Sequence, residues 1–396
     1  MAEVQTSVTS GEMAARFIEF VRMHAHNAGL CLGRVPHPRT GKPEVNLDLA
    51  RVLIEQLAAI ELKTRGNLNN HIGVPLTLLS IEPETEFAVV EMGMSDFREI
   101  ALLSDIARPD AAVVTNIGDA HLAQLGSRSG IAQAKLEILQ GLADGGLLVV
   151  PGGEPLIAQH LPAGAAERWN IVTFGEEEGS DVRLASVELG ERRTKFRIAG
   201  SPVEFSIPMP GRHNARNALA AVAAARYFGA SDEAIAAGLS AFTPTGMRVE
   251  RVAAASGAVI WNDAYNASPT SMRAALDLLG EIKGFRRKFA VLGDMLELGP
   301  AERELHREIG KTVDPARIDF VYAFGSLGAE IAEAAAERFP PGAVKIFASK
   351  EELAGELERT SGEGDLILVK ASRGMEMETI VERLRADRPE GGERWN

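Results

Sequence analysis

DLILVKASRG at residues 365–374 joins a short apolar run to a group of polar side chains, and this pairing recurs along the chain. Six further apolar runs of strand length alternate with helical patterns: FAVV (87–90), AAVV (111–114), GLLVV (146–150), AVIW (258–261), FAVLG (289–293) and FVYAF (320–324). Strands that alternate with helices form parallel sheets whose faces the helices cover. The sequence therefore predicts an α/β fold with parallel sheets.

The sequence pattern changes between residues 181 and 211, and this change divides the chain. Alternating apolar and polar residues, with turn residues between them, predict antiparallel strands that end the first sheet. An Ala-rich helix follows from Asn214 to about Phe228, and a smaller helix covers 232–241. Thr-Pro-Thr-Gly at 243–246 then breaks the pattern. We expect three parts: an atypical N-terminal segment (1–61), a central domain (62–242) and a C-terminal domain (243–396).

Length, charge and cysteine content narrow the class of protein. The chain has 396 residues, 45% of them hydrophobic, which suits two or three globular domains. A net charge of -13 argues against a general nucleic-acid surface, which needs clustered Lys and Arg. The single cysteine, Cys31, excludes an internal disulfide and favours a reducing compartment. No stretch reaches the ~18 apolar residues of a membrane span and no signal peptide is evident, so we expect a cytoplasmic protein.

Polar residues follow several of the predicted strands. In open parallel sheets, ligands bind just beyond the carboxyl ends of the strands, so residues in these positions are candidates for a site. They are Glu91 after FAVV, Asn116 and His121 after AAVV, Asp263 and Asn266 after AVIW, and Lys370, Ser372 and Arg373 after DLILV. We therefore expect the functional site along these strand ends.

Two of these candidates and one helical lysine have competing explanations. Glu91 suits a hard cation such as Mg2+, or is a solvated strand end. His121 is either a metal or phosphate ligand or a structural histidine. Lys135 falls on the same helical arc as Ile131 and Ile138, so its side chain faces the core. Its ammonium either reaches back to water or points into a site, where burial would lower its pKa and favour reaction with CO2.

The start of the Ala-rich helix and the following domain boundary offer a nucleotide site. Asn214 is the expected N-cap, and a helix N-terminus attracts anions. His213 and Asn217 lie four residues apart on one helical face, without a structural reason of their own. Arg248 follows the boundary and Asp263 ends the next strand, where they could contact phosphate and ribose. Each of these two also has a simpler explanation as a surface charge.

Two segments resemble the end of a phosphate loop, GxxxxGK[ST]. Gly310-Lys311-Thr312 has the right ending, but position 305 is Leu and the preceding residues predict a helix. Thr40-Gly41-Lys42 follows no strand, and Pro43 occupies the Ser/Thr position. Neither is expected to bind phosphate. The chain also has no GxGxxG, which gives a dinucleotide-dependent dehydrogenase little support.

Taken in order, the motifs resemble the Mur ligases of bacterial cell-wall synthesis. The central-domain motifs are KTRGNLNNHIGVP (63–75), VEMGMS (90–95), TNIGDAHL (115–122), AKLEI (134–138) and HNARNALAA (213–221). The C-terminal motifs are DAYNASPTS (263–271), LGDMLELG (292–299) and VKASRG (369–374). The resemblance runs from about residue 62 to 385. It implies a parallel-sheet ATPase domain, incomplete at its N-terminal edge, followed by a smaller Rossmann-like C-terminal domain.

The resemblance also implies roles for individual residues. Glu91 and His121 would be catalytic ligands of Mg2+, and Lys135, carried as a carbamate, would hold the second of two ions. The residues that would contact ATP are His213, Asn214, Asn217, Arg248, Asp263 and Asn266. The residues that would lie towards the other substrates are Asn67, Asn69, Asn70, Lys370, Ser372 and Arg373.

The implied activity is ATP-dependent ligation of D-alanyl-D-alanine to UDP-N-acetylmuramoyl-tripeptide through an acyl phosphate, by a monomer. The sequence departs from the family pattern in one respect. Mur ligases carry a UDP-sugar-binding domain and a GxxGK[ST] loop ahead of the Gly-Asn-x-Asn-Asn segment, and residues 1–60 match neither. A partner chain could supply that part. The alternative is a catalytically impaired protein that binds nucleotide or a cell-wall precursor.

Overall fold

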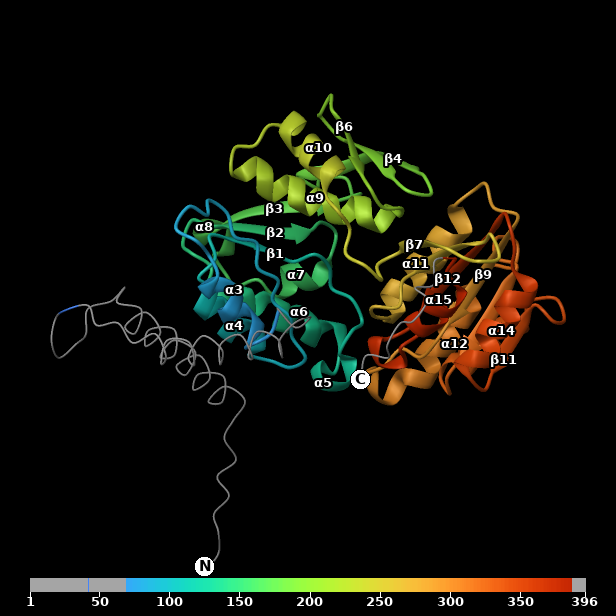
Figure 1. Cartoon of the computed structure of the whole chain (residues 1–396). Coiled ribbons are helices and arrows are strands. Elements are labelled where there is room, and N and C mark those ends of the chain that lie inside the picture. The colour runs from blue at the N-terminus through green and yellow to red at the C-terminus, as the bar shows by residue number, and fades with distance from the viewer. Residues whose placement is uncertain (1–41, 43–68, 387–396) are drawn as a thin grey trace, which may run out of the picture. The chain divides into compact units, whose positions relative to one another are not determined.

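The computed structural model describes Lys42 and residues 69–386, which belong to two compact units. The first unit comprises residues 1–112 with 133–146, and the second comprises 113–132 with 147–396. Figure 1 shows the helices and strands of both. The predicted substrate residue Asn67 lies outside the described residues, as does the N-terminal segment 1–61 apart from Lys42.

Helix α4 organises the first unit. The Glu137 carboxylate accepts hydrogen bonds from the backbone N–H groups of Arg98 (2.7 Å) and Ala101 (3.3 Å), so an acidic side chain occupies the positive end of the helix. Farther along, the Ser104 hydroxyl donates to the Ile138 carbonyl at 2.5 Å. These bonds tie α4 to the short helix η1. The elements of this unit are α3 (Gly73–Leu79), α4 (Glu99–Ala107), η1 (Glu137–Gln140) and parts of β1 and α6.

The prediction of a strand at residues 87–90 is wrong. This segment has no regular secondary structure, and its valine side chain at position 89 is 98% exposed. A β-strand needs a neighbouring strand for its backbone hydrogen bonds, and no strand among the described residues pairs with 87–90. An apolar run alone was therefore not sufficient to make a strand here.

The first sheet is mixed, as the sequence predicts. Its six strands lie in chain order, with β2, β3 and β4 parallel and β4, β5 and β6 antiparallel. The antiparallel pairs confirm the expected edge at 181–211. The strands are β1 (Ala111–Val113), β2 (Leu147–Pro151), β3 (Asn170–Gly175), β4 (Val182–Leu189), β5 (Thr194–Ile198) and β6 (Glu204–Ile207).

Two of the helices associated with this sheet match the predicted ones closely. Helix α9 (Arg212–Tyr227) begins two residues before the predicted start, and α10 (Asp232–Ala241) has the predicted bounds. The buried face of α9 is largely alanine, which lets the helix approach the strands closely. The remaining helices of this part are α5 (Leu122–Leu125), α6 (Arg128–Leu136), α7 (Pro155–His160) and α8 (Ala165–Arg168).

The second sheet has the order β11-β10-β9-β12-β8-β7, and all neighbours except β7 and β8 are parallel. Its strands are β7 (Glu250–Ala253), β8 (Val259–Asn262), β9 (Arg287–Leu292), β10 (Phe320–Phe324), β11 (Val344–Phe347) and β12 (Asp365–Lys370). Its helices are α11 (Pro269–Glu281), η2 (Gly299–Ala301), α12 (Glu302–Thr312), α13 (Gly328–Ala336), α14 (Lys350–Thr360), η3 (Arg373–Met375) and α15 (Glu378–Leu384). The α/β prediction is confirmed.

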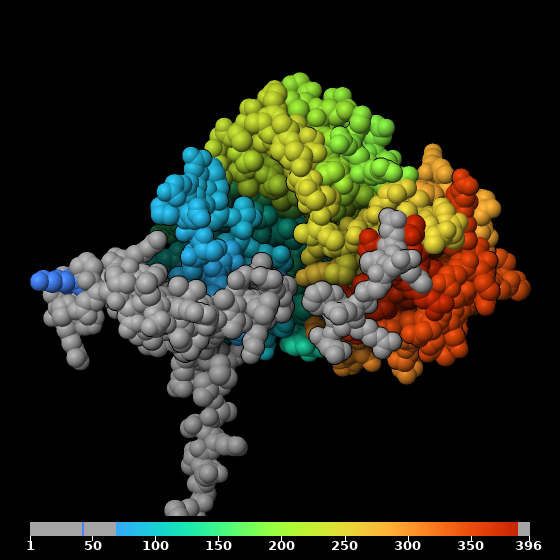
Figure 2. All heavy atoms as spheres, viewed as in Figure 1, coloured from blue at the N-terminus to red at the C-terminus, as the bar shows by residue number. Residues whose placement is uncertain are grey.

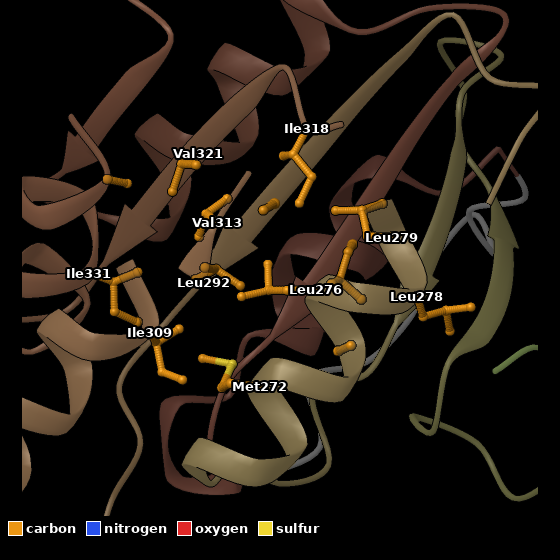
Figure 3. Close-up of a cluster of buried hydrophobic side chains, with 14 of the residues drawn as sticks. Met272, Leu276, Leu278, Leu279, Leu292, Ile309, Val313, Ile318, Val321 and Ile331 are labelled. Atoms are coloured by element: carbon orange, nitrogen blue, oxygen red, sulfur yellow. The ribbon is translucent and has the colours of Figure 1, made fainter. Parts of the chain in front are cut away.

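Both faces of the second sheet are covered. Side chains of α11, α12 and α13 pack on one face with Leu292 of β9 (Figure 3). Side chains of α14 and α15 pack on the other face with Ile367 of β12. In Figure 2 the orange and red residues of this part form a continuous surface. Burial on both faces explains why the central strands are unbroken apolar runs.

A buried carboxylate anchors the start of β12. Asp365 is fully buried and receives hydrogen bonds from Arg286 and Arg287, and from the Gly362 N–H. Burial raises the pKa of Asp365, but the hydrogen bonds from the two arginines outweigh it and leave the pKa lowered. The charged form is thus stabilised inside the fold. Among the described residues, no helix is long and apolar enough to cross a membrane.

As predicted from the sequence, the segment Gly310-Lys311-Thr312 is not a phosphate loop. All three residues belong to helix α12. Gly310 faces α13, where an added Cβ would lie 2.2 Å from the carbonyl oxygen of Ile331. The glycine is therefore required for helix packing.

The change Gly310→Ala should lower the free energy of unfolding by about 1–2 kcal/mol. Helix propensity favours Ala by about 1 kcal/mol, but a Cβ pressed against a backbone carbonyl costs more, because the neighbouring helix must move. Lys311→Ala, on the exposed side of α12, should change stability by less than about 0.5 kcal/mol. Urea denaturation of both variants checks this, and equal stabilities would contradict the packing role.

Candidate functional site

The carboxyl ends of β8, β9 and β12 meet at one edge of the second sheet. Lys370 pairs in register with Leu292, and Val369 with Asn262. The strand order reverses its direction of growth between β9 and β12, which is where open α/β sheets bind ligands. The polar residues that follow these strands are therefore the candidate site of this part of the chain.

A buried ion pair dominates this edge. The Lys370 ammonium is 3% exposed and lies 2.7 Å from the Asp263 carboxylate. It also donates to the carbonyl oxygen of Asn266 at 2.9 Å. The predicted nucleotide residues Asp263 and Asn266 are thus brought together with Lys370, which had been predicted to contact a different substrate.

His213 shares the electrostatic environment of this pair. Burial lowers the pKa of its imidazole, the Asp263 carboxylate raises it, and the Lys370 ammonium lowers it, so the net shift is downward. The neutral ring is favoured, which leaves one nitrogen as a donor and the other as an acceptor. The structure therefore brings His213 of α9 close to the strand ends of the second sheet.

Asn214 is not the N-cap of α9, contrary to the prediction. Gly211 occupies that position with φ 115°, a conformation that favours glycine. A Cβ at residue 211 would also lie 2.6 Å from the His213 ring. Asn214 instead donates from its side chain to the Pro210 carbonyl at 2.7 Å, whereas Asn217 is exposed one turn later.

Arg248 lies in a strained segment beside this edge. The flanking residues Met247 and Val249 have φ values of 57° and 53°, which are unfavourable for non-glycine residues and most of all for a β-branched one. The Val249 N–H donates to Asp263 at 3.2 Å and helps to hold this conformation. The Arg248 guanidinium stacks 4.5 Å above the centre of the Tyr265 ring.

A groove of about 400 Å3 adjoins Arg248. Its walls combine prolines and arginines with two glutamates: Pro208, Pro210, Pro244, Arg192, Arg248, Arg251, Glu191 and Glu250. Arg251 pairs with Glu191, so Arg192 and Arg248 are the cations available to a phosphate. The volume of the groove is within the range of small-molecule sites.

The loop after β9 also lies at this edge of the sheet. Asp294 is buried and accepts from the N–H groups of Leu327 and Gly328, at the start of α13. Ser372 is also buried; its hydroxyl accepts from the Leu296 N–H at 2.9 Å. Arg373 is largely exposed and pairs with Glu378. Of the residues predicted to face a second substrate in this part, only Arg373 has an exposed side chain.

His306 holds this loop against α12 through hydrogen bonds. It is fully buried; its Nε2 accepts from the Met295 N–H at 2.8 Å, and its Nδ1 lies 2.6 Å from the Glu302 carbonyl. These contacts require a neutral ring with the proton on Nδ1, because a carbonyl only accepts and an N–H only donates. The tautomer is thereby set by the backbone.

His121 faces the same loop. Its Nδ1 lies 2.6 Å from the Glu297 carboxylate, and both residues have left-handed backbone conformations, with φ values of 61° and 62°. Within the described part of the chain, the His121 side chain forms its hydrogen bond through Nδ1, and Nε2 forms none. A histidine held through one nitrogen has the other oriented for a ligand.

In the first unit, Asn69 contacts the predicted site residue Glu91. Its side-chain amide donates to Glu91 at 3.0 Å, and its backbone carbonyl accepts from the Gly93 N–H. A Cβ at Gly93 would lie 2.9 Å from the Asn69 side chain, so a larger residue there would displace the amide. Asn70 accepts from the Ile72 and Gly73 N–H groups in the turn before α3. Glu91 is exposed, which suits a ligand role better than a core role.

Lys135 is half-buried near the end of α6. Burial lowers the pKa of its amine. Desolvation is the condition that the reactive interpretation requires, because CO2 adds to the neutral amine and not to the ammonium ion. Within the described part of the chain, no group of three or more His, Cys, Asp or Glu side chains could hold a metal ion.

Comparison with known proteins identifies the family. The Mur ligase middle domain matches residues 47–225, and the Mur ligase glutamate ligase domain matches 247–373. UDP-N-acetylmuramoyl-tripeptide–D-alanyl-D-alanine ligase of Bacillus subtilis (strain 168) is 49% identical over 322 residues, covering 81% of this chain and 69% of that protein. The chain belongs to the Mur ligase family. The predicted resemblance is confirmed.

Two further Mur ligase relatives agree with this assignment. The Escherichia coli (strain K12) ligase of the same name is 35% identical over 351 residues, covering 87% of this chain and 75% of that protein. A crystal structure of MurF from Acinetobacter baumannii has a TM-score of 0.72 at 28% identity, covering 94% of this chain and 79% of that one.

A third family model matches the start of the chain. It is a domain of unknown function (DUF1844) and covers residues 14–75, so it overlaps the middle-domain match at 47–75. KTRGNLNN at 63–70 falls in both matches. No family was predicted for residues 1–61, and nearly all of this segment lies outside the described residues.

Several residues of the site had no role assigned from sequence. Asp119, Asp294 and Glu297 stand within the quoted motifs, and the rule used for the other candidates points to all three, since Asp119 follows β1 and the other two follow β9. His306 had no such signal, because a histidine inside an amphipathic helix resembles any partly buried polar residue.

Acid should destabilise the fold through His306. Burial lowers the pKa of this ring below its ordinary value of 6.5, against the opposing effects of the Glu302 carbonyl and nearby carboxylates. As the pH falls through that ordinary value, the unfolded chain takes up the proton first, so the contribution is complete above it and lost below it. We expect the free energy of unfolding to fall between about pH 7.5 and 5.5, and to fall less in His306→Gln.

Urea denaturation at the two pH values measures this difference. His213→Gln serves as a comparison, because burial lowers the pKa of His213 as well. An unchanged pH dependence in His306→Gln would refute the assignment of a neutral buried ring.

Proposed function

We propose that this chain is an ATP-dependent ligase that joins D-alanyl-D-alanine to UDP-N-acetylmuramoyl-tripeptide. The observation that carries the proposal is the 49% identity over 322 residues with a relative of that name. In this reaction ATP phosphorylates the terminal carboxylate of the tripeptide. The amine of the dipeptide then attacks the acyl phosphate, forming the amide and releasing phosphate.

We assign nucleotide binding to residues 62–242, as the central domain, together with the start of the C-terminal domain, 243–396. The groove beside Arg248 offers cations for the phosphates and apolar surface for the base. The neutral His213, with Asn217 and Asn266, offers donors and acceptors for base and ribose. The Asp263 carboxylate lies 2.7 Å from the Lys370 ammonium and suits a ribose hydroxyl.

The substrate roles divide according to exposure. Lys370 and Ser372 are buried and hold the strand ends, so they act by positioning Asp263 and the loop after β9. Arg373 is exposed and suits the carboxylate of the incoming dipeptide. Asn69 orients Glu91, and Asn70 shapes the turn before α3.

Each unit offers donors that suit Mg2+. In the first unit, Glu91 presents a carboxylate at the surface, and a carbamate on Lys135 would add oxygen ligands. In the second unit, Glu297 orients His121 through Nδ1. When bound, the metal ion would offset the negative charge of the phosphate groups. Lys135 must lose its proton before it can take up CO2, and its burial favours that loss.

A second candidate function is binding without turnover. The observation in its favour is that Gly310-Lys311-Thr312 lies inside α12, so it provides no amide cradle for the β and γ phosphates. Such a protein would bind ATP or a cell-wall precursor without forming the amide.

Phosphate release in the presence of ATP, Mg2+, UDP-N-acetylmuramoyl-tripeptide and D-alanyl-D-alanine tests the ligase. We expect release to require all four, and Lys135→Ala to lower it by at least about 100-fold, because charge at the transferring phosphoryl group would lose its stabilisation. With 13C-labelled bicarbonate, the wild-type chain should give a carbamate resonance that Lys135→Ala lacks.

Lys311→Ala is the matched control and should release phosphate at the wild-type rate. Release no faster than in Lys135→Ala would contradict the ligase. In that case, a thermal shift on adding ATP with Mg2+ would support binding without turnover, and its absence would exclude that function too.

A further inference from the structure

Leu296 is a large apolar side chain exposed at the edge of the second sheet where the strands end. It follows the end of β9 and is 40% exposed. A Cβ added to Gly374 would lie 3.0 Å from the Leu296 Cδ1 atom, so these two residues are neighbours. The loops after β9 and β12 emerge side by side because Leu292 pairs in register with Lys370. Leu296 therefore lies beside the segment that carries Arg373.

Buried side chains hold the backbone around Leu296. Its N–H donates to the hydroxyl of Ser372 at 2.9 Å, and Ser372 is 4% exposed. The N–H of the preceding residue, Met295, donates to the fully buried His306 at 2.8 Å. The Leu296 side chain is thus presented to solvent from a backbone that two hydrogen bonds fix.

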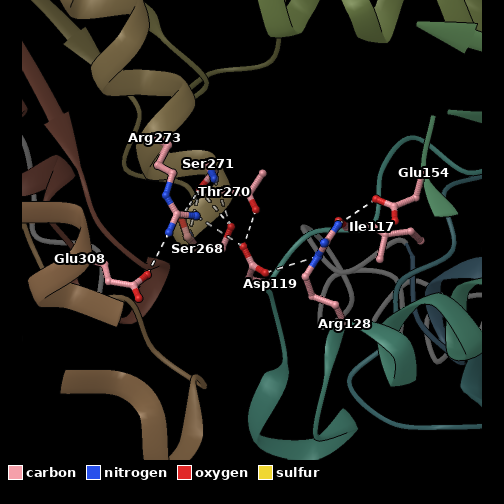
Figure 4. Close-up of polar contacts among 9 residues, drawn as sticks. All are labelled: Ile117, Asp119, Arg128, Glu154, Ser268, Thr270, Ser271, Arg273 and Glu308. Atoms are coloured by element: carbon pink, nitrogen blue, oxygen red, sulfur yellow. Dashed lines mark hydrogen bonds and ion pairs between the residues drawn. The ribbon is translucent and has the colours of Figure 1, made fainter. Parts of the chain in front are cut away.

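Ser372 is in turn bonded to the segment that precedes α11. Its hydroxyl donates to the Ala267 carbonyl at 3.4 Å, immediately before the N-cap residue Ser268. Figure 4 shows the capping box in which the side chains of Ser268 and Ser271 accept from each other's backbone N–H groups. The hydroxyl that holds the Leu296 loop is therefore itself attached to a capped helix start.

Arg373 presents a guanidinium group next to this apolar side chain. Its Nη1 donates to the Glu378 carboxylate and lies 3.2 Å from the Met247 sulfur. The Arg373 side chain is 56% exposed, whereas that of Glu378 is 16% exposed. Both contacts involve Nη1, and the Nε and Nη2 atoms suit a planar carboxylate of a ligand. Glu378 thus holds the guanidinium from the protein side, and its exposed side is oriented for a ligand.

A guanidinium beside an exposed leucine suits a ligand that carries a carboxylate next to a small apolar group. The C-terminal residue of D-alanyl-D-alanine has a carboxylate and a methyl group on the same carbon atom. Its amine is at the other end of the molecule, where it must stay accessible to attack the acyl phosphate. Contact of one methyl group with an apolar surface changes affinity by about 4- to 10-fold.

We propose that Leu296 and Arg373 form the subsite for the C-terminal residue of the incoming dipeptide. Leu296 contacts the methyl group and determines the preference for it, Arg373 binds the carboxylate, and Glu378 is a positioning residue for Arg373. The identity of the ligand rests on the proposed function. The side-chain arrangement belongs to the C-terminal part alone and does not depend on turnover.

Binding of two dipeptides to the full chain tests the role of Leu296. Saturation-transfer NMR in the presence of Mg2+, a non-hydrolysable ATP analogue and UDP-N-acetylmuramoyl-tripeptide gives a Kd for D-alanyl-D-alanine and for D-alanylglycine, which lacks the C-terminal methyl group. We expect the wild-type chain to bind D-alanyl-D-alanine about 4- to 10-fold more tightly. Leu296→Ala should lower this ratio to less than about twofold, and Leu296→Met, which keeps an apolar side chain, should preserve it.

Ile346→Ala is the matched control for Leu296→Ala. It removes an exposed apolar side chain of the same size from β11 and should leave the ratio of the two dissociation constants unchanged. Since both substituted residues are exposed, both variants should keep the melting temperature of the wild-type chain.

Glu378→Gln tests the positioning role separately. It should weaken binding of both dipeptides by the same factor, roughly 10-fold, because both have the carboxylate that Arg373 binds. The ratio between them should stay as in the wild-type chain. D-alanyl-D-alaninamide lacks that carboxylate, so its weaker binding should be the same in Glu378→Gln and in the wild-type chain.

An unchanged ratio in Leu296→Ala would overturn the role of Leu296, and normal binding of both dipeptides by Glu378→Gln would overturn the role of Glu378. A wild-type chain that shows the methyl preference but releases no phosphate would contradict the ligase and still support the subsite. Equal binding of the two dipeptides by a wild-type chain that does release phosphate would overturn the subsite and leave the ligase supported. Absence of both dipeptide binding and phosphate release would contradict both.

Discussion

The buried ion pair between Lys370 and Asp263 is the interaction on which the candidate site depends. The Lys370 side chain is nearly inaccessible to water, and a buried ammonium group is costly unless a carboxylate such as Asp263 lies beside it. Removing one partner of such a pair costs about 3–5 kcal/mol, a large part of the stability of an ordinary domain. The pair also holds neighbouring segments, because Lys370 donates to the Asn266 carbonyl and Asp263 accepts from the Val249 N–H. One ion pair thus ties the end of β12 to the segment after β8 and to the segment that carries Arg248.

The parallel sheet explains why this interaction forms where it does. Every strand of the second sheet except β7 runs in the same direction, so residues from distant parts of the sequence emerge at one edge. Asp263 and Lys370 are 107 residues apart in sequence and adjacent in space for this reason. The same geometry brings the loop after β9 to that edge, where Asp294 and His306 hold it through backbone N–H groups. The buried polar side chains Asp294 and His306 at this edge therefore have backbone partners.

Sequence patterns predicted the elements whose burial is uniform. Strands β9 and β12 are covered on both faces, so they are continuous apolar runs and were predicted from sequence. Strands β3 and β11 are only partly buried and were missed, because mixed runs such as VKIF lack a clear period. FAVV at 87–90 shows the opposite error, since an apolar run forms a strand only when a neighbour supplies hydrogen bonds. The site could likewise be predicted only in part. Asp263 and Lys370 were chosen as candidates because each follows a strand. Their pairing could not be predicted, because it depends on the order of the strands in the sheet, which no local sequence pattern encodes.

Strained backbone conformations occur in the segments of the second unit that contact this edge of the sheet. Among the described residues, His121, Met247, Val249 and Glu297 all have positive φ without being glycine. Each such residue costs of order 1–3 kcal/mol and persists only where its surroundings impose it. Here the imposing contacts are the His121–Glu297 hydrogen bond and the bond from Val249 to Asp263. The strain therefore falls on the segments that carry His121 and Arg248, the residues assigned to metal and phosphate. His121 is thus oriented by Glu297, and the segment of Arg248 is held by Asp263.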